Sequence, residues 1–444
     1  MLFHSDSILF WDTVQFTSKH GSWFYDYGLL TALPVHLDSG HPPVFGMYQA
    51  LLWKLFGQSL LVSHLSMLPF VYIIIWFAIK LGGLYTTSTP WLYPAALLLC
   101  PFMLGHLILV SPDIVLMAAF LMALHSILAY RHVPLIISSV VLAMISMRGF
   151  AMMGGLAIFL AFVLWKKGER VKPLFIKLLR IYFFPVALFA AYQSWHMMTQ
   201  DWVGYHEASP WSASFAKVSM KGILKNVMVF GWRIVDYGMV VPVLFLLVHG
   251  LKSIVQGDGL DKLFRLLIIL IGILFLLIIP FSGLMNHRYF LPIVTVILLL
   301  TCKIIGQWEG TKRTIGIIAI IGSMVAGNMI VYPDTVAQGW DSTAAHWPIY
   351  GLYKEMSAYI NDNPQLAKTQ IGTAFPFRVS EHFLELNNRE IGFHNYDMHK
   401  DQYILRSNIM NDFPNYEIAK LDNWTVLKTF KKNGVHLTLY QRTP

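Results

Sequence analysis

The sequence predicts an α-helical protein that crosses a membrane many times, with a large first outer loop and a small C-terminal soluble α/β domain. Of its 444 residues, 56% are hydrophobic and only 13% are charged, which is about half the charged fraction of a soluble protein. The mean hydropathy is +0.55. Apolar stretches long enough to span a bilayer recur along most of the chain. This composition excludes a disordered chain, a secreted disulfide-rich domain and almost any soluble enzyme.

The apolar stretches predict about ten transmembrane helices, which together form a membrane domain over residues 59–332. A single apolar run also fits a buried helix of a soluble protein, but ten in series do not. The pair from 133 to 165 is short and fits a tilted or re-entrant arrangement. The predicted spans are 60–80, 90–108, 113–130, 133–147, 149–165, 174–198, 238–254, 265–281, 289–305 and 313–332.

Lys and Arg are distributed unevenly between the connections, and this predicts the orientation of the spans. Fourteen of them lie in one alternate set of connections and six in the other. Cytoplasmic connections carry the excess, so both termini are predicted to be extracytoplasmic in a multi-pass protein of a bacterial inner or plasma membrane. The basic balance thus orients helices and predicts no nucleic-acid partner. The richer set is 80–90, 130–133, 165–180, 250–265 and 302–313.

Residues 1–58 form the first extracytoplasmic loop in this topology. They are too polar to span a membrane, and nothing in front of them resembles a signal peptide. We therefore expect a hydrophobic helix upstream of Met1 in the complete gene, in preference to a tail that is translocated unaided. The loop is rich in Asp, His and aromatic residues, which fits an interfacial helix or a catalytic loop.

Residues 333–444 have a different character, with 11 basic and 12 acidic side chains and only short apolar runs. The pattern predicts helices at 351–361 and 378–387 and strands at 368–375 and 435–440. We expect a small extracytoplasmic α/β domain with room for a modest core.

The first loop supplies four candidate functional residues: Asp6, Asp12, Asp38 and His41. Asp6 stands before a segment that can be helical, so capping is the structural alternative to a chemical role. His41 precedes two prolines and a helix predicted over 44–56, which ends before a glycine. At a helix start His41 would lie near the positive end of the dipole, where a phosphate binds well. The alternative is a rigid corner that turns the loop back to the membrane.

Three more candidates lie at the outer ends of the predicted spans. Asp113 follows Ser-Pro, an ordinary helix start, but an acid at a membrane edge is also a functional candidate. Arg148 and Arg288 lie on the outer side, which fits snorkelling to headgroups or a phosphate clamp. Arg233 and Asp236 are spaced for an i,i+3 ion pair. The sequence contains no zinc-protease, phosphate-loop or serine-hydrolase motif.

Taken together, these motifs resemble those of membrane-embedded C-type glycosyltransferases that use polyprenyl-phosphate sugars. The most similar branch contains protein O-mannosyltransferases and lipid A aminoarabinose transferases. The order and rough spacing of the motifs cover nearly all of residues 1–332, although no single motif is specific. In chain order they are Asp6-Ser7-Ile8-Leu9-Phe10, Gly21-Ser22-Trp23, His41-Pro42-Pro43, Phe56-Gly57, Asp113 and Arg288-Tyr289-Phe290-Leu291-Pro292.

The resemblance implies transfer of a sugar from a polyprenyl-phosphate donor to a lipid, glycan or protein acceptor, with inversion. It implies that Asp6 is the catalytic base, that Asp113 is a second catalytic or supporting acid, and that His41 and Arg288 bind the donor phosphate. A sugar phosphate already has a good leaving group, so one base and a few cations suffice. No cofactor is required; a divalent cation is compatible, and no metal ligands are assigned. The supporting residues are Asp12, Asp38 and Arg148.

Three departures from the family pattern keep other functions open. Ser7 replaces a second acid, Phe10 replaces a Tyr, and the first transmembrane helix is missing. Ser7 leaves open an inactive scaffold of the same fold. A lipid or polysaccharide flippase or transporter, and an enzyme of polysaccharide polymerisation or ligation, are further alternatives. Transporters place ionisable residues at the midplane, whereas these apolar runs are largely free of charge, so we expect a glycosyltransferase.

Overall fold

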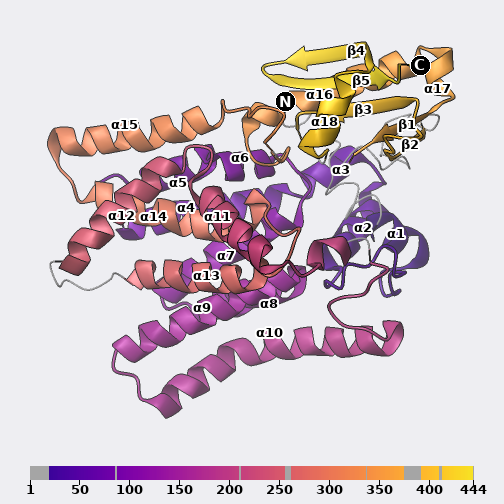
Figure 1. Ribbon diagram of the computed structural model, residues 1–444. Helices are drawn as coiled ribbons and strands as arrows, with labels where there is room; N and C mark the ends of the chain where they lie inside the picture. The colour runs from indigo at the N-terminus through magenta and orange to yellow at the C-terminus, as the bar shows by residue number, and fades with distance from the viewer. Residues whose placement is uncertain are drawn as a thin grey trace.

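The computed structural model describes residues 20–85, 88–209, 212–255, 262–336, 338–374, 392–409 and 413–443. It is mostly helical, with a small sheet near the C-terminus (Figure 1). The long helices lie roughly side by side, and the helices of the first loop lie at one end of them. The candidates Asp6 and Asp12 and the predicted helix 378–387 lie outside the described residues.

Each predicted span coincides with one helix or with a pair of helices. Among the described residues, four helices are long and apolar enough to cross a membrane, or five if the bent pair α11–α12 is one span. The helices are α3 (Leu60–Leu65), α4 (Leu68–Tyr85), α5 (Leu92–Leu99), α6 (Pro101–Leu107), α7 (Pro112–Leu128), α8 (His132–Ile145), α9 (Met147–Lys166), α10 (Val171–Gln200), α11 (Met220–Val235), α12 (Val240–Val255), α13 (Lys262–Ile278), α14 (Leu291–Gly306) and α15 (Gly310–Gly327).

Two features differ from the sequence prediction. The stretch 90–108 is predicted as one span, but it breaks at Cys100, between α5 and α6. Pro101 lacks an N–H and disfavours helical backbone in the residue before it, and Cys100 accordingly has a ψ of 124°. The predicted connection 199–237 contains α11, which meets α12 at 96°. Lysines interrupt the apolar run of α11, so the run is too short to be recognised as a span.

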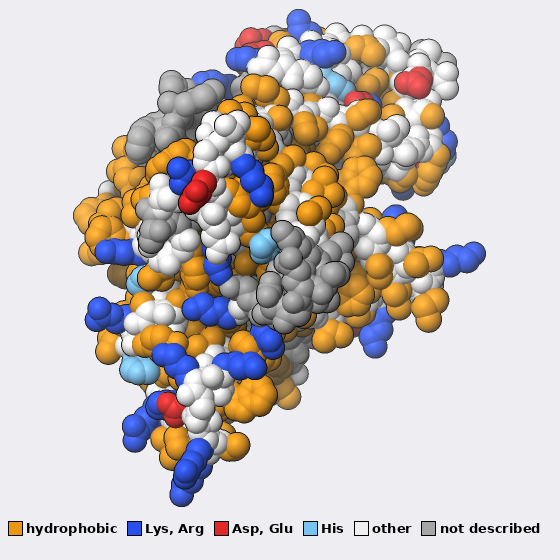
Figure 2. Space-filling model, turned by 90° about the vertical axis from the view of Figure 1, so that its left-hand side faces the viewer, with side chains coloured by type: hydrophobic (Ala, Val, Ile, Leu, Met, Phe, Trp, Pro, Cys, Tyr) orange, Lys and Arg blue, Asp and Glu red, His pale blue; other side chains and the backbone are white. Residues whose placement is uncertain are grey.

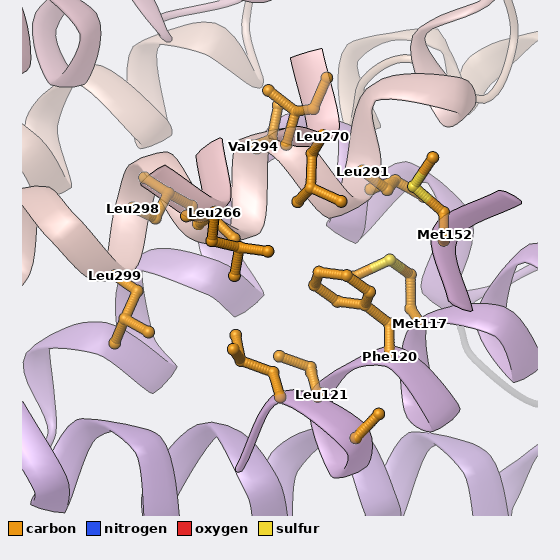
Figure 3. Close-up of a cluster of buried hydrophobic side chains, with 14 of the residues drawn as sticks. Met117, Phe120, Leu121, Met152, Leu266, Leu270, Leu291, Val294, Leu298 and Leu299 are labelled. Atoms are coloured by element: carbon orange, nitrogen blue, oxygen red, sulfur yellow. The ribbon is translucent and has the colours of Figure 1, made fainter. Parts of the chain in front are cut away.

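Apolar side chains from α7, α9, α13 and α14 pack together in the core of the helical region (Figure 3). Met117 and Phe120 of α7 point toward Met152 of α9 and Leu270 of α13. Cys100 and Cys302 are free thiols and are also buried. Close packing of this kind supplies dispersion contacts, which stabilise helix pairs in water and in lipid alike. The packing fixes α7, α9 and α14 against one another, so their first residues share one end.

The first loop contains α1 (Ser22–Tyr27) and α2 (Val44–Phe56). The helix predicted over 44–56 is confirmed, and Gly57 ends it with a φ of +88°, a backbone conformation that favours glycine. The indole N–H of Trp53 donates to Ser63 Oγ at 2.9 Å. This bond ties α2 to α3, so the loop is anchored on the helical region.

The C-terminal sheet is mixed, with strand order β2-β1-β3-β5-β4. Strand β1 is parallel to β2 and β3, and β5 is antiparallel to β3 and β4. The predicted helix 351–361 and the two predicted strands are present, and the buried face of α16 packs on the sheet. The elements are α16 (Pro348–Asn361), α17 (Pro364–Ala367), β1 (Gln370–Thr373), β2 (Gly392–Asn395), β3 (Tyr403–Ser407), α18 (Asn415–Leu421), β4 (Thr425–Lys432) and β5 (Val435–Gln441).

Lys and Arg gather on the end of the helical region that faces left in Figure 1. Figure 2 shows this face directly, with many Lys and Arg side chains and few Asp and Glu. Its lower part is formed by the connection between α9 and α10, where Lys166, Lys167, Arg170 and Lys172 are exposed. The set of connections that is richer in Lys and Arg in the sequence thus lies at one end of the folded helical region.

Candidate functional site

Asp113, Arg148 and Arg288 meet at one end of the helical region, although 175 positions separate the first from the last in the sequence numbering. The Arg148 guanidinium forms a salt bridge with Asp113 Oδ1. Arg288 Nε lies 3.8 Å from Asp113 Oδ2. The three side chains are between 4% and 18% exposed. We call these three residues the arginine cluster.

Each member of the arginine cluster lies at the start of a helix. Asp113 is in the first turn of α7, which Ser111 caps by accepting from Asp113 N at 3.1 Å. Arg148 begins α9, which Ser146 caps by accepting from Gly149 N at 3.0 Å. Arg288 lies in the 3-10 helix η4 (His287–Phe290), which leads into α14. Three helix starts therefore converge here, and the positive ends of their dipoles favour negative charge.

Tyr289 lies beside both arginines of the cluster. The guanidinium carbon of Arg148 is 4.4 Å from the centre of the Tyr289 ring, and that of Arg288 is 5.6 Å away. A flat guanidinium keeps its N–H fork available while its face contacts a ring. Tyr289 thereby helps to orient both forks, a role that its place in the Arg-Tyr motif did not reveal.

His41 is brought to the same end of the molecule by the first loop. Tyr192 of α10 donates its hydroxyl hydrogen to the His41 carbonyl at 3.0 Å. Gly40 has a φ of +70°, and a Cβ there would lie 2.8 Å from the Gly204 carbonyl oxygen. Burial, together with the positive charge of Arg148, lowers the pKa of His41 to about 4. His41 is therefore a neutral imidazole beside the arginine cluster at neutral pH.

Asp38 connects the first loop to the end of α10 through hydrogen bonds. Its carboxylate accepts from Gly40 N at 2.7 Å and lies 2.8 Å from His196 Nε2. His196 Nδ1 lies 2.8 Å from the Trp202 carbonyl, so both ring nitrogens face acceptors. Ser209 Oγ donates to the Asp38 carbonyl at 2.8 Å. Asp38, a predicted supporting residue, thus acts on the shape of the loop that carries His41.

A second buried group lies next to the arginine cluster, and we call it the Asp236 network. Asp236 Oδ2 lies 2.8 Å from His287 Nε2 and 3.4 Å from Arg233, which confirms the predicted i,i+3 pair. Tyr332 donates to Asp236 Oδ1, and Ser342 Oγ lies 2.9 Å from His287 Nδ1. Because His287 directly precedes Arg288, the network also fixes the segment that carries this arginine.

The structure brings together four of the sequence candidates, namely Asp113, Arg148, Arg288 and His41. Asp38 acts beside them, and Asp6 and Asp12 lie outside the described residues. Sequence reasoning missed His196 and His287, because each acts through a partner far away in the sequence. Within the described part of the chain, no group of three or more His, Cys, Asp or Glu is arranged to hold a metal ion.

No protein-family model, curated protein or solved structure matches this chain.

Proposed function

We propose that the protein is a membrane glycosyltransferase that moves a sugar from a polyprenyl-phosphate donor to an acceptor on the outer side of the membrane. One observation carries the proposal: Arg148 and Arg288 meet at Asp113, where three helix N-termini converge. Guanidinium groups and the positive ends of helix dipoles both favour a phosphate. The resemblance of the loop and Arg-Tyr motifs to C-type glycosyltransferases supplies the reaction type.

The residues divide into binding, positioning and chemical roles. Arg288 and His41 bind the donor phosphate, and Arg148 reinforces the positive charge there. Asp113 already accepts from one guanidinium and lies beside another, which suits it to fix the positions of the two guanidinium groups. From the resemblance of the first loop we assign Asp6 as the base that takes the proton from the acceptor hydroxyl while the phosphate leaves as an anion.

The proposed topology places this cluster outside the cytoplasm, in a domain of about ten spans. The support is the cationic face of Figure 2, which lies at the far ends of α9, α13 and α15 from the cluster. Cytoplasmic connections are rich in Lys and Arg. In this orientation the C-terminal α/β domain is extracytoplasmic as well.

The test is donor binding and transfer by the purified protein with labelled polyprenyl-phosphate sugars. Arg288→Lys keeps the charge but loses the bidentate fork, and we expect roughly 10- to 150-fold weaker donor binding, from about 1.5–3 kcal/mol per charge-assisted contact. Arg288→Ala and His41→Ala should weaken donor binding as well. The control is Arg131→Lys, an exposed arginine on the cationic face.

Headgroup snorkelling predicts a different result, because Lys reaches the interface as well as Arg does. Donor affinity equal to that of the unchanged protein in all three variants would therefore refute the phosphate clamp. Movement of intact donor across the membrane, without transfer of its sugar, would favour a flippase.

A further inference from the structure

Helix α11 has an exposed face that combines lysines with apolar side chains. The opposite face is fixed inside the protein: Phe230 packs on Phe275 and Phe290, with ring centres 5.5 and 5.0 Å apart. Asn226 donates to the carbonyls of Ile279 and Phe281 at 2.9 Å each. The exposed face is therefore held in one orientation and is not free to rotate into the core.

The lysines occupy one flank of this face. At about 100° per residue, Lys221, Lys225 and Trp232 fall within about 40° of one another around the helix axis. Met220 and Leu224 lie on the other flank and are 79% and 64% exposed. Lysines and a tryptophan beside an apolar flank are typical of a helix that lies in the membrane interface.

The orientation of this helix relative to α12 fits a place along the membrane surface. Helix α11 meets α12 at 96°, so if α12 crosses the bilayer, α11 lies along its surface. Lys217, just before α11, pairs as an antiparallel bridge with Phe281. Arg233, near its end, donates to the Met285 carbonyl at 3.1 Å. The segment that leads to Arg288 therefore runs beside α11, with its Arg288 end at the C-terminal end of the helix and the lysines at the N-terminal end.

The positive charge of the lysines at the start of α11 favours an anionic ligand. Lys217, Lys221 and Lys225 are all exposed, and no carboxylate among the described residues forms an ion pair with them. The positive-inside rule does not explain three lysines at the end opposite the cationic face of Figure 2. A cation near an anionic bilayer surface contributes to binding, and the exposed apolar flank supplies the contact with acyl chains.

We propose that α11 is an interfacial helix that binds the phosphate headgroup of an anionic phospholipid through Lys217, Lys221 and Lys225. The site holds the headgroup at the membrane surface, at the N-terminal end of α11. This inference requires the chain to be in a membrane, but it does not depend on sugar transfer.

The test uses the full chain reconstituted in phosphatidylcholine vesicles with a photoactivatable phosphatidylglycerol, and cross-links are mapped by mass spectrometry. We expect cross-links on 220–235 that unlabelled phosphatidylglycerol displaces and phosphatidylcholine does not. Replacing all three lysines by Gln should weaken this binding about fivefold per lysine, from the ~1 kcal/mol of one cation near an anionic surface. Replacing them by Arg should preserve it.

A matched control removes three lysines from the other end, Lys166, Lys167 and Lys172, and should leave the α11 cross-links unchanged. Equal displacement by phosphatidylcholine, or unchanged cross-linking of the Gln variant, would overturn the proposal. Displacement by inorganic phosphate would also overturn it, because the site would then take a soluble anion. Donor binding is measured separately, so failure of the glycosyltransferase proposal would not be confused with failure here.

Discussion

The arginine cluster and the Asp236 network use similar side chains a few residues apart, yet they are built for different purposes. In the network, the Asp236 carboxylate is surrounded by Tyr237 N, Tyr332, His287 and Arg233, all from the protein. Its side chain is 0% exposed. In the cluster, two guanidiniums lie at converging helix starts beside one carboxylate. The first arrangement surrounds one acid with mixed partners, whereas the second places two arginines at one acid, which is the basis of the anion site proposed above.

The comparison teaches that burial and ion pairing alone do not identify a functional site. Both groups are buried and both contain Asp and Arg. What separates them is the set of partners around the acid. Asp236 accepts from a backbone N–H and a tyrosine and contacts a histidine and one arginine, whereas Asp113 lies beside two arginines that both contact the Tyr289 ring. Changes in the network should therefore affect stability, and changes around the cluster should affect activity.

The largest effect is expected for Asp6→Asn, which tests the functional side of the comparison. Loss of a positioned base lowers a rate by about 10²–10⁴, and the near-isosteric amide should leave thermal stability unchanged. Sugar transfer and thermal unfolding of the purified protein give both readouts. Asp26→Asn, an exposed acid in the same loop, is the control. Full turnover by Asp6→Asn would move the base to Asp12 or Asp113.

Asp236→Ala tests the stability side. It leaves buried donors without their acceptor, and breaking a buried pair costs about 3–5 kcal/mol. We expect a clearly lower melting temperature in detergent and a lower folded yield. Asp26→Ala removes one exposed carboxylate and should change neither. An unchanged melting temperature for Asp236→Ala would show that the Asp236 network is not a stabilising element, and the comparison would fail.

The smallest effect is expected at Asp334, which forms ion pairs with Arg406 and His436 in the C-terminal domain. It belongs neither to the arginine cluster nor to the Asp236 network. A hydrogen bond with His436 and the charge of Arg406 lower the pKa of Asp334 from 3.8 to about 2. A lowered folded-state pKa means that the stabilisation is present above about pH 4 and is lost as the pH falls toward 2. Asp334→Asn should therefore flatten the acid limb of stability against pH, measured by thermal unfolding.

Asp422→Asn, an exposed acid in the same domain, should leave the acid limb as it is. An acid limb that is equally steep with and without Asp334 would assign the loss of stability to other carboxylates.

Local patterns in the sequence predicted most of the helix positions and part of the sheet. The apolar runs place α7, α9, α10 and α14 within a few residues, and Gly57 ends α2 where its backbone freedom predicts. The Arg233–Asp236 pair follows from helical spacing. These features depend on residues close in sequence, for which periodicity and turn chemistry are informative.

The long-range partners could not be predicted in this way. Asp113 with Arg148, Asp38 with His196, and His287 with Ser342 each join different elements. Their pairing depends on how the helices pack, and single residues in a pattern carry no information about that. The break at Cys100 is different, because Pro101 is a local signal for a helix break. The prediction of one span over 90–108 gives more weight to the length of the apolar run than to this proline.

The burial of both cysteines has a practical consequence. A thiol reacts as the exposed thiolate, and Cys100 and Cys302 are each 0% exposed. The unchanged chain is therefore expected not to react with maleimides in its folded state. A single cysteine introduced at Lys221 or at Lys312, which lie at opposite ends of the helical region, would be the one reactive thiol. An impermeant maleimide applied to intact cells then reads the sidedness of each end directly, without removal of any native residue.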